Sequence, residues 1–192
     1  MPRIEPLEPP YPAGVGARLG AMMPPGVPSI ALFRTLVKNL PMTDAMGPWG
    51  RYELGKGLSL SLRDREILID RTCARCGCEY EWGVHVAFFA DRVGLTQDQV
   101  SSLTHGRPDD PCWDEGRDRV LIEAADQLHD TSRIDDAVWS ELTGHLSEEQ
   151  MLDLLFLCGW YHAISFAANG AGVAPEHGAP RFHDVGAVDR RR

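Results

Sequence analysis

Apolar positions along this chain recur mainly with the period of an α-helix. From Ser29 to Leu40 apolar side chains return every three or four residues, and Pro41 follows directly. Because proline lacks an amide hydrogen and clashes with the preceding turn, the pattern predicts a helix over 29–40 that ends at Pro41. A Gly-rich segment, Gly47–Gly57, is a second helical candidate.

Later helices are marked by polar residues that can cap them. Ser61 precedes Leu-Arg-Asp, Thr96 precedes Gln-Asp-Gln, and Ser147 precedes Glu-Glu-Gln. Each sequence resembles a capping box, in which two side chains bond free amides at the start of a helix. Asp114 can cap a further helix. The remaining helices are therefore expected over about 61–72, 78–94, 96–103, 114–128, 135–142 and 147–168.

No segment shows sustained alternation with a period of two, so the predicted fold class is all-α. We expect one compact domain of about seven helices over 29–170, without an internal repeat. Many of the prolines lie in residues 1–28, which predicts an extended N-terminal arm laid over a neighbour, with a disordered tail as the alternative. Residues 171–192 begin with Gly, Ala and Pro and are expected to form a C-terminal tail.

Composition and charge narrow the class of protein. With 192 residues, of which 43% are apolar and 24% charged, the chain can bury a core. A net charge of −9 without a basic stripe argues against a nucleic-acid partner. The apolar run 151–168 is broken by Asp153, Gly159 and His162, which favours a buried helix over a membrane span. The N-terminus lacks the apolar core of a signal peptide, so a cytoplasmic location is expected.

The segment from Glu66 to His85 carries the most reactive groups. It holds three of the five cysteines, Cys73, Cys76 and Cys78, together with a histidine and several carboxylates. An odd number of cysteines and the lack of an export signal argue against a disulfide framework. Thiol chemistry and metal binding are the alternatives for a cysteine cluster of this kind.

A helix that begins near Cys78 would place one thiol, one carboxylate and one imidazole on a single face. Cys78, Glu81 or Trp82, and His85 then follow at spacings of three or four residues. The helix N-terminus favours a thiolate at Cys78, and His85 could exchange a proton with it. Glu66 on the preceding helix can orient either group or act as the base.

Structural roles compete with these chemical ones. Buried cysteines often pack as small apolar groups, and this role is favoured for Cys73 and Cys76, although a redox role stays open for the pair. No βαβ pattern of a thioredoxin-like fold surrounds that pair. The other histidines considered are expected to satisfy core hydrogen bonds or face solvent: His129, His145, His162, His177 and His183.

A zinc site is one further alternative for the cluster. Cys73, Cys76, Cys78 and His85 would offer four ligands of suitable type. Structural zinc sites normally take their ligands from two separated pairs, whereas these four fall within thirteen residues. No metal ligand is therefore assigned from the sequence.

These motifs resemble the carboxymuconolactone decarboxylase and alkylhydroperoxidase D-like superfamily. The resemblance covers about Ser29 to Gly106 and is clearest from Arg63 to Leu103. It rests on Arg-Asp-Arg-Glu-Ile-Leu-Ile, on Glu-Tyr-Glu-Trp-Gly-Val-His and on Gly-Leu-Thr-Gln-Asp-Gln-Val. It implies an all-α subunit, a homo-oligomer that is commonly a trimer or hexamer, and no bound cofactor.

The peroxidase branch of this superfamily carries Cys-x-x-Cys-x-x-x-His on one helix and a glutamate on the preceding one. Counted back from His85, its first cysteine corresponds to Cys78 and its glutamate to Glu66. Its second cysteine, which attacks the peroxide, falls on Glu81. The Cys-x-x-Cys pair of this chain is out of register with that pattern.

The Tyr-Glu-Trp…His run instead resembles the decarboxylase branch, which implies acid–base chemistry on a small carboxylated lactone or related metabolite. The leading hypothesis is a cofactor-free lyase or isomerase whose catalytic residues are Glu66, Cys78, Glu81 and His85. Tyr80 and Trp82 are expected to line its substrate pocket. The alternatives are a thiol peroxidase that uses Cys78, resolved by Cys76 or Cys73, and a non-catalytic binding protein.

Overall fold

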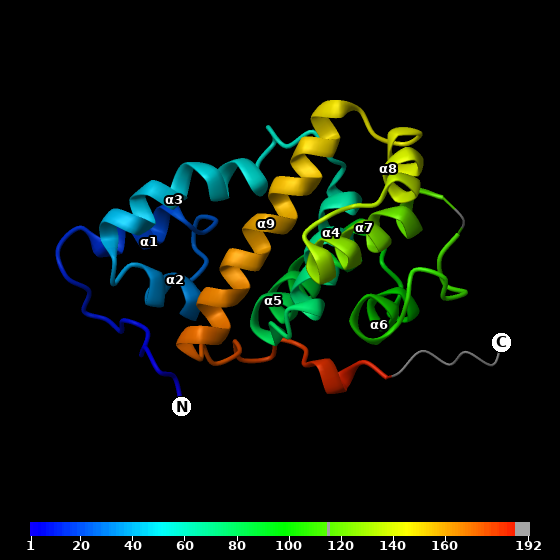
Figure 1. Ribbon diagram of the computed structural model, residues 1–192. Coiled ribbons are helices and arrows are strands. Elements are labelled where there is room, and N and C mark those ends of the chain that lie inside the picture. Colours follow the sequence, from blue (N-terminus) through cyan, green and yellow to red (C-terminus); the bar gives the residue numbers. More distant parts are fainter. Residues whose placement is uncertain (115, 187–192) are drawn as a thin grey trace.

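Residues 1–114 and 116–186 are described by the computed structural model, and within them the chain forms helices and no strand. The α-helices there are α1 (Val15–Ala21), α2 (Ala31–Leu36), α3 (Leu40–Glu53), α4 (Leu62–Arg75), α5 (Glu79–Phe89), α6 (Gln97–His105), α7 (Arg117–Thr131), α8 (Asp136–Thr143) and α9 (Glu148–Ala171). The long helix α9 separates α1–α3 from α4–α8 (Figure 1). The predicted all-α class is confirmed, with more helices than the seven expected.

The three predicted capping boxes all form. Ser61 opens α4, Thr96 opens α6 and Ser147 opens α9, each accepting a hydrogen bond from the third residue of its helix. The side chain of that third residue bonds back to the cap residue in every case. These reciprocal bonds satisfy amides that the helix cannot pair itself, so the sequence signal locates the helix starts closely.

The prediction that a helix ends at Pro41 was wrong. Helix α2 ends at Leu36, and Pro41 lies in the first turn of α3. Proline fits there because the first amides of a helix have no intrahelical acceptor. Asn39 caps this start by accepting a hydrogen bond from the Met42 amide at 3.2 Å. The Gly47–Gly57 candidate is therefore the second half of a helix that begins earlier and ends at Glu53.

Asp114 does not start the next helix either. Helix α7 begins at Arg117, after Gly116 with φ of 110° and no side-chain cap. This backbone conformation favours glycine, so the boundary is set by backbone geometry rather than by a capping carboxylate.

Helix α4 is the centre of the core. Every residue from Asp64 to Cys73 is buried, and the helix packs against α5, α6, α7 and α9. A charged group buried at this depth needs a partner. Asp64 pairs with Arg117 at 2.6 Å, and Arg71 pairs with Asp126 at 2.6 Å. A helix enclosed on all sides can therefore carry charged residues without exposing them.

The N-terminal arm lies on its own chain, along the end of α9. The Arg3 amide donates to the Ala171 carbonyl at 2.7 Å. The arm is not extended throughout, because the stretch between its proline clusters forms α1. Val15 and Leu19 of that helix are buried together with Val37.

The described part of the C-terminal tail also folds back onto the domain. Arg181 pairs with Glu79 at 2.5 Å, and the Val185 side chain is buried. A short 3-10 helix, Phe182–Asp184, lies between them. Residues 187–192 of the predicted tail lie outside the described residues.

Helix α9 is long and apolar enough to cross a membrane by length and composition alone. In this fold 56% of its most apolar window is buried inside the protein. Trp160, Tyr161 and Ile164 face the interior. As predicted from its interrupted apolar run, α9 is a core helix.

Candidate functional site

A tight turn between α4 and α5 determines the geometry of the site. Gly77 has φ of 60°, a left-handed conformation that glycine adopts without strain. The amide of Cys78, the N-cap residue of α5, donates to the Cys73 carbonyl at 2.8 Å. The turn reverses the chain, so Glu66 near the start of α4 meets His85 near the end of α5.

Glu66 and His85 form a buried pair. The Glu66 Oε2 atom lies 2.8 Å from His85 Nδ1, and the other oxygen, Oε1, accepts from the Arg65 guanidinium at 2.6 Å. Glu66 has no solvent-exposed surface and His85 only 4%. An imidazole held in this way carries its Nδ1 proton toward the carboxylate and presents Nε2 for chemistry.

Two further groups face the Nε2 side of His85. The Tyr161 hydroxyl, from α9, lies 2.9 Å from Nε2. The Glu81 Oε2 atom, one turn before His85 on α5, lies 3.9 Å from the same nitrogen. The other oxygen of Glu81, Oε1, is buried and has no hydrogen-bond partner among the described residues. Such an unsatisfied oxygen is costly in a folded protein and is available to a bound molecule.

Burial and charge act differently on the two glutamates. For Glu66, burial alone would raise the pKa, but the charge and hydrogen bond of His85, together with Arg65, lower it overall. For Glu81, burial raises the pKa and His85 offsets this only in part. Burial would lower the pKa of His85, yet Glu66 raises it overall. The site therefore combines a carboxylate, an imidazole with a raised pKa and a second carboxyl group that holds its proton to a higher pH than usual.

A cavity of about 430 Å³ opens over Glu81, His85 and Tyr161. Its other walls come mainly from apolar residues of α2, α3, α5 and α9, among them Phe89 and Trp160. This is the size of a small-molecule site. Low polarity strengthens the hydrogen bonds of the few polar groups that line it.

Arg51 of α3 also lines this cavity. Its side chain is exposed, and it forms no ion pair with any described residue. The carboxyl and imidazole groups on the cavity wall are those of Glu81 and His85. An exposed, unpaired guanidinium beside a largely apolar cavity attracts a small anion such as a carboxylate.

The predicted catalytic residues separate into two groups. Glu66, Glu81 and His85 are brought together, whereas Cys78 makes no hydrogen bond to His85 among the described residues and does not line the cavity. The Cys78 thiol is fully buried, and burial raises its pKa to about 11. The helix N-terminus does not offset this desolvation, so the thiol form is favoured at neutral pH.

Tyr80 and Trp82 do not line this cavity. The Tyr80 hydroxyl donates to Glu176 at 2.6 Å and accepts from the Leu32 amide at 2.9 Å, which fixes the start of α2. Trp82 is fully buried and packs against Phe182, with ring centroids 5.0 Å apart. The aromatic walls come instead from other residues, Phe33, Phe88, Phe89, Trp160 and Tyr161.

All five cysteines are free thiols. Cys73 is fully buried in the core, and burial raises its pKa well above the usual value. Cys76 is only half-buried and lies beside His129 on α7. The two cysteines of the Cys-x-x-Cys pair thus lie in different surroundings, Cys73 in the core and Cys76 beside α7. Neither of them lines the cavity.

Sequence reasoning missed Tyr161, Arg65 and Arg51. Tyr161 could have been found because it lies within an apolar helical run. A tyrosine buried there needs a hydrogen-bond partner for its hydroxyl, which points to a polar group inside the core. Arg65 directly precedes Glu66, and such a pair on a buried helix signals internal charge pairing. No local pattern distinguishes Arg51, because its place at the cavity depends on how α3 packs on α9.

Residues 47–110 match the family model of the carboxymuconolactone decarboxylase family. This third of the chain contains Glu66, Cys78, Glu81 and His85 but not Tyr161. No curated protein matches the chain.

Two solved structures share the fold. One is an uncharacterized peroxidase-related protein from Silicibacter sp., with a TM-score of 0.75, 16% identity, and coverage of 93% of this chain and 96% of that chain. The other is a protein of unknown function from Agrobacterium tumefaciens, described as a candidate antioxidant defence protein AhpD. Its TM-score is 0.65 and its sequence identity is 18%, and the match covers 73% of this chain and 95% of that chain. With the family match, they confirm the resemblance to the carboxymuconolactone decarboxylase and alkylhydroperoxidase D-like superfamily. At such identities the structures establish the fold and leave the reaction to be argued from the site.

Proposed function

We propose that the chain is an enzyme that performs cofactor-free acid–base chemistry on a small carboxylated metabolite. The observation that carries the proposal is that His85 lines an apolar cavity while its Nδ1 atom is held by Glu66 at 2.8 Å. A group positioned in this way moves protons efficiently, because it needs little reorganisation during the reaction.

Decarboxylation is the reaction that best uses these groups. The bond between the carboxylate carbon and the adjacent carbon breaks, CO₂ leaves, and the electron pair passes into a neighbouring carbonyl to give an enolate. The His85 imidazolium then delivers a proton to that carbon, and solvent restores the proton afterwards. When Glu81 carries a proton, its carboxyl group and the Tyr161 hydroxyl can donate hydrogen bonds to the enolate oxygen as charge develops there.

The cavity supports a substrate with an apolar body and an anionic end. Aromatic and aliphatic side chains form most of the wall, and Arg51 supplies a positive charge. Carboxylated lactones and β-keto acids combine these features with a carbonyl that can accept the electron pair. An isomerisation that moves a proton next to such a carbonyl would use the same groups.

The alternative is a thiol peroxidase, which the descriptions of the two similar structures favour. The buried Cys78 thiol, with its pKa raised to about 11, argues against it, because the thiolate is the form that attacks peroxides. Acid–base chemistry is therefore the better-supported function.

We further propose a cytoplasmic homo-oligomer, a trimer or hexamer, as the working form. Support comes from exposed apolar side chains on one face of α9, Leu152, Phe156 and Phe166. A stripe of this kind is unusual on a monomer and typical of a contact surface.

The proposal is tested by incubating the protein in D₂O with a panel of carboxylated lactones and β-keto acids. Release of CO₂ and deuterium at the neighbouring carbon are followed by NMR. Replacing His85 with Ala should slow both by about 100-fold or more. Equal turnover by the H85A variant, for every substrate that the parent protein converts, would refute the proposal.

A further inference from the structure

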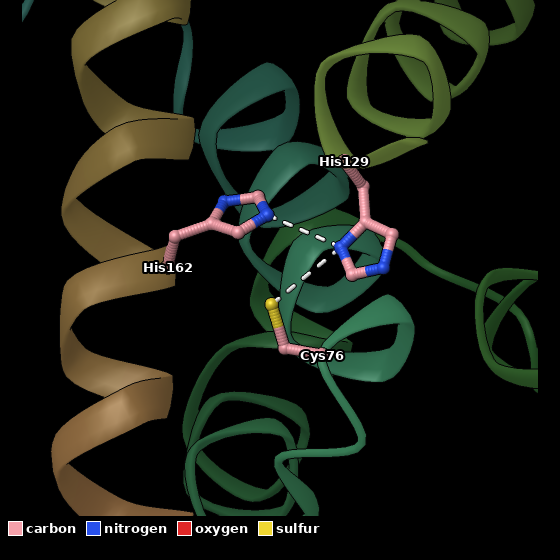
Figure 2. Close-up of side chains that lie close together, drawn as sticks. All are labelled: Cys76, His129 and His162. Carbon is pink, nitrogen blue, oxygen red and sulfur yellow. Dashed lines mark hydrogen bonds between the residues drawn. The ribbon is translucent and has the colours of Figure 1, made fainter. Parts of the chain in front are cut away.

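A second cluster of reactive side chains lies outside the cavity, between α4, α7 and α9. Cys76 Sγ lies 3.7 Å from His129 Nδ1, which lies 3.1 Å from His162 Nε2. All three ligand atoms lie within 4.8 Å of one another. Figure 2 shows the thiol and the two imidazoles pointing toward a common centre, the imidazoles from α7 and α9 and the thiol from the residue that follows α4.

We propose that Cys76, His129 and His162 form a binding site for a zinc-type divalent cation. The inference is independent of the proposed function, because none of the three residues lines the cavity. A thiolate and two imidazoles are the ligands that zinc prefers, and three protein ligands leave a fourth position for water.

The spacing of the three ligand atoms fits a tetrahedral ion. With Zn–N of about 2.05 Å and Zn–S of about 2.3 Å, tetrahedral angles separate two nitrogens by about 3.4 Å and a nitrogen from the sulfur by about 3.6 Å. Two of the three separations in the protein are 3.1 and 3.7 Å, and the third, between Cys76 Sγ and His162 Nε2, is within 4.8 Å. Small side-chain shifts are therefore enough for the ion to be held.

The hydrogen bond on the far side of His162 supports the same assignment. His162 Nδ1 donates to the Cys158 carbonyl, one turn earlier on α9, at 2.8 Å. Because a carbonyl oxygen can only accept, Nδ1 of His162 carries the proton and Nε2 has a free lone pair. Nε2 is the atom that faces His129. Metal-binding histidines commonly donate their second ring N–H to a backbone carbonyl in this way.

The electrostatics of the cluster permit a cation. An imidazole binds a metal ion through a ring nitrogen in its neutral form. The positive charge of Arg75, which acts on His129, is itself paired with Asp126 and Asp130. All three ligands are half-buried rather than enclosed, so an ion can reach them from solvent.

Binding exchanges one proton for the metal. The Cys76 thiol loses its proton as the Zn–S bond forms, while both neutral imidazoles bind through lone pairs without proton loss. No electron transfer is required. The ion would join the C-terminal end of α4 to α7 and α9, so it should stabilise the folded chain.

The test titrates Zn²⁺ into the untagged full chain after EDTA treatment, by calorimetry in buffers of different ionisation enthalpy. We expect one Zn²⁺ per chain, release of about one proton, and a rise in Tm. Co²⁺ in place of Zn²⁺ should give the thiolate-to-cobalt absorption band and the visible bands of a tetrahedral site. If that band is absent in the parent protein, the proposal is wrong.

Matched variants locate the site. Cys76→Ser and His162→Gln should each weaken Zn²⁺ binding more than tenfold, whereas Cys112→Ser, at a half-buried cysteine outside the cluster, should bind like the parent. Tm in EDTA reports whether each variant folds. Unchanged affinity in Cys76→Ser, or equal loss in Cys112→Ser, would overturn the assignment.

Discussion

Glu66 Oε2 and His85 Nδ1 lie 2.8 Å apart, and the pair is almost completely shielded from solvent. Two residues nineteen positions apart on different helices thus behave as one unit. The charge of Glu66 raises the pKa of His85, and the charge of His85 lowers that of Glu66. The reactivity of the imidazole therefore depends on the carboxylate behind it.

Replacing Glu66 with Gln should lower both the stability of the protein and the pKa of His85. The change leaves the buried Arg65 guanidinium without its anionic partner, which should cost about 3 kcal/mol in the free energy of unfolding. The His85 imidazolium should lose its proton at a lower pH. The alkaline limb of the pH–activity profile should therefore shift to lower pH. Urea unfolding and NMR titration of the His85 ring measure the two effects. Glu141→Gln, at an exposed carboxylate on α8, is the control, and an unchanged His85 titration would contradict the prediction.

Replacing Tyr161 with Phe should reduce turnover while changing stability little. The ring keeps its packing, and only the hydroxyl 2.9 Å from His85 Nε2 is removed. The lost hydrogen bond should cost about 1 kcal/mol of stability. If the hydroxyl stabilises developing charge, kcat should fall about 10- to 100-fold with little change in KM. A variant with the kcat of the parent would remove Tyr161 from the mechanism.

The sequence allowed the helical class and most helix starts after residue 60 to be predicted, because those signals are local. Ser61, Thr96 and Ser147 cap helices through residues only three positions away. Pro41 was misread for a related reason, since proline both ends helices and fits their first turn. Only the packing of α2 and α3 decides between these outcomes.

The candidate site could be predicted only where its members lie within two adjoining helices. Glu66, Glu81 and His85 follow from helical spacing and a tight turn, whereas Tyr161 comes from a helix 76 residues further along. The raised pKa of Cys78 was also hidden, because it results from complete burial and not from the position of Cys78 at a helix start. The Cys76, His129 and His162 cluster joins three helices and has no local sequence signal.

Changing Leu152 and Phe166 together to Asp should dissociate the proposed oligomer. Both side chains are more than half exposed, at 58% and 70%, and lie on one face of α9. Buried carboxylates at a contact surface would be costly, so the molar mass from light scattering should fall toward that of one chain. Ser140→Asp, at an exposed position on α8, should leave the mass unchanged. A parent protein that is already monomeric would contradict this prediction.

Replacing Cys78 with Ala should leave turnover of a carboxylated substrate nearly unchanged. The thiol is fully buried, so its removal should cost about 1 kcal/mol of stability. If the protein is instead a thiol peroxidase that uses Cys78, this variant should lose all peroxide consumption. Free thiols counted before and after peroxide treatment distinguish the two functions. Loss of two thiols per chain in the parent, abolished in C78A, would favour the peroxidase.

Replacing Glu81 with Gln should change how stability depends on pH. Burial raises the pKa of Glu81, so the folded state holds this proton more tightly than the unfolded state. Its contribution to stability is therefore fully present below the unfolded pKa of about 4.3 and is lost as the pH rises through the folded pKa. Above the folded pKa, a tenfold difference in proton affinity between the two states corresponds to about 1.4 kcal/mol of lost stability.

The Glu81→Gln variant stays neutral at every pH and should escape this loss. The difference in free energy of unfolding, variant minus parent, should grow from pH 4 toward neutrality and then level off. Urea unfolding across that range measures it, with Glu141→Gln as the control for an exposed carboxylate. A difference that stays constant with pH would show that Glu81 is ionised in the folded protein. It could not then donate a hydrogen bond to an enolate.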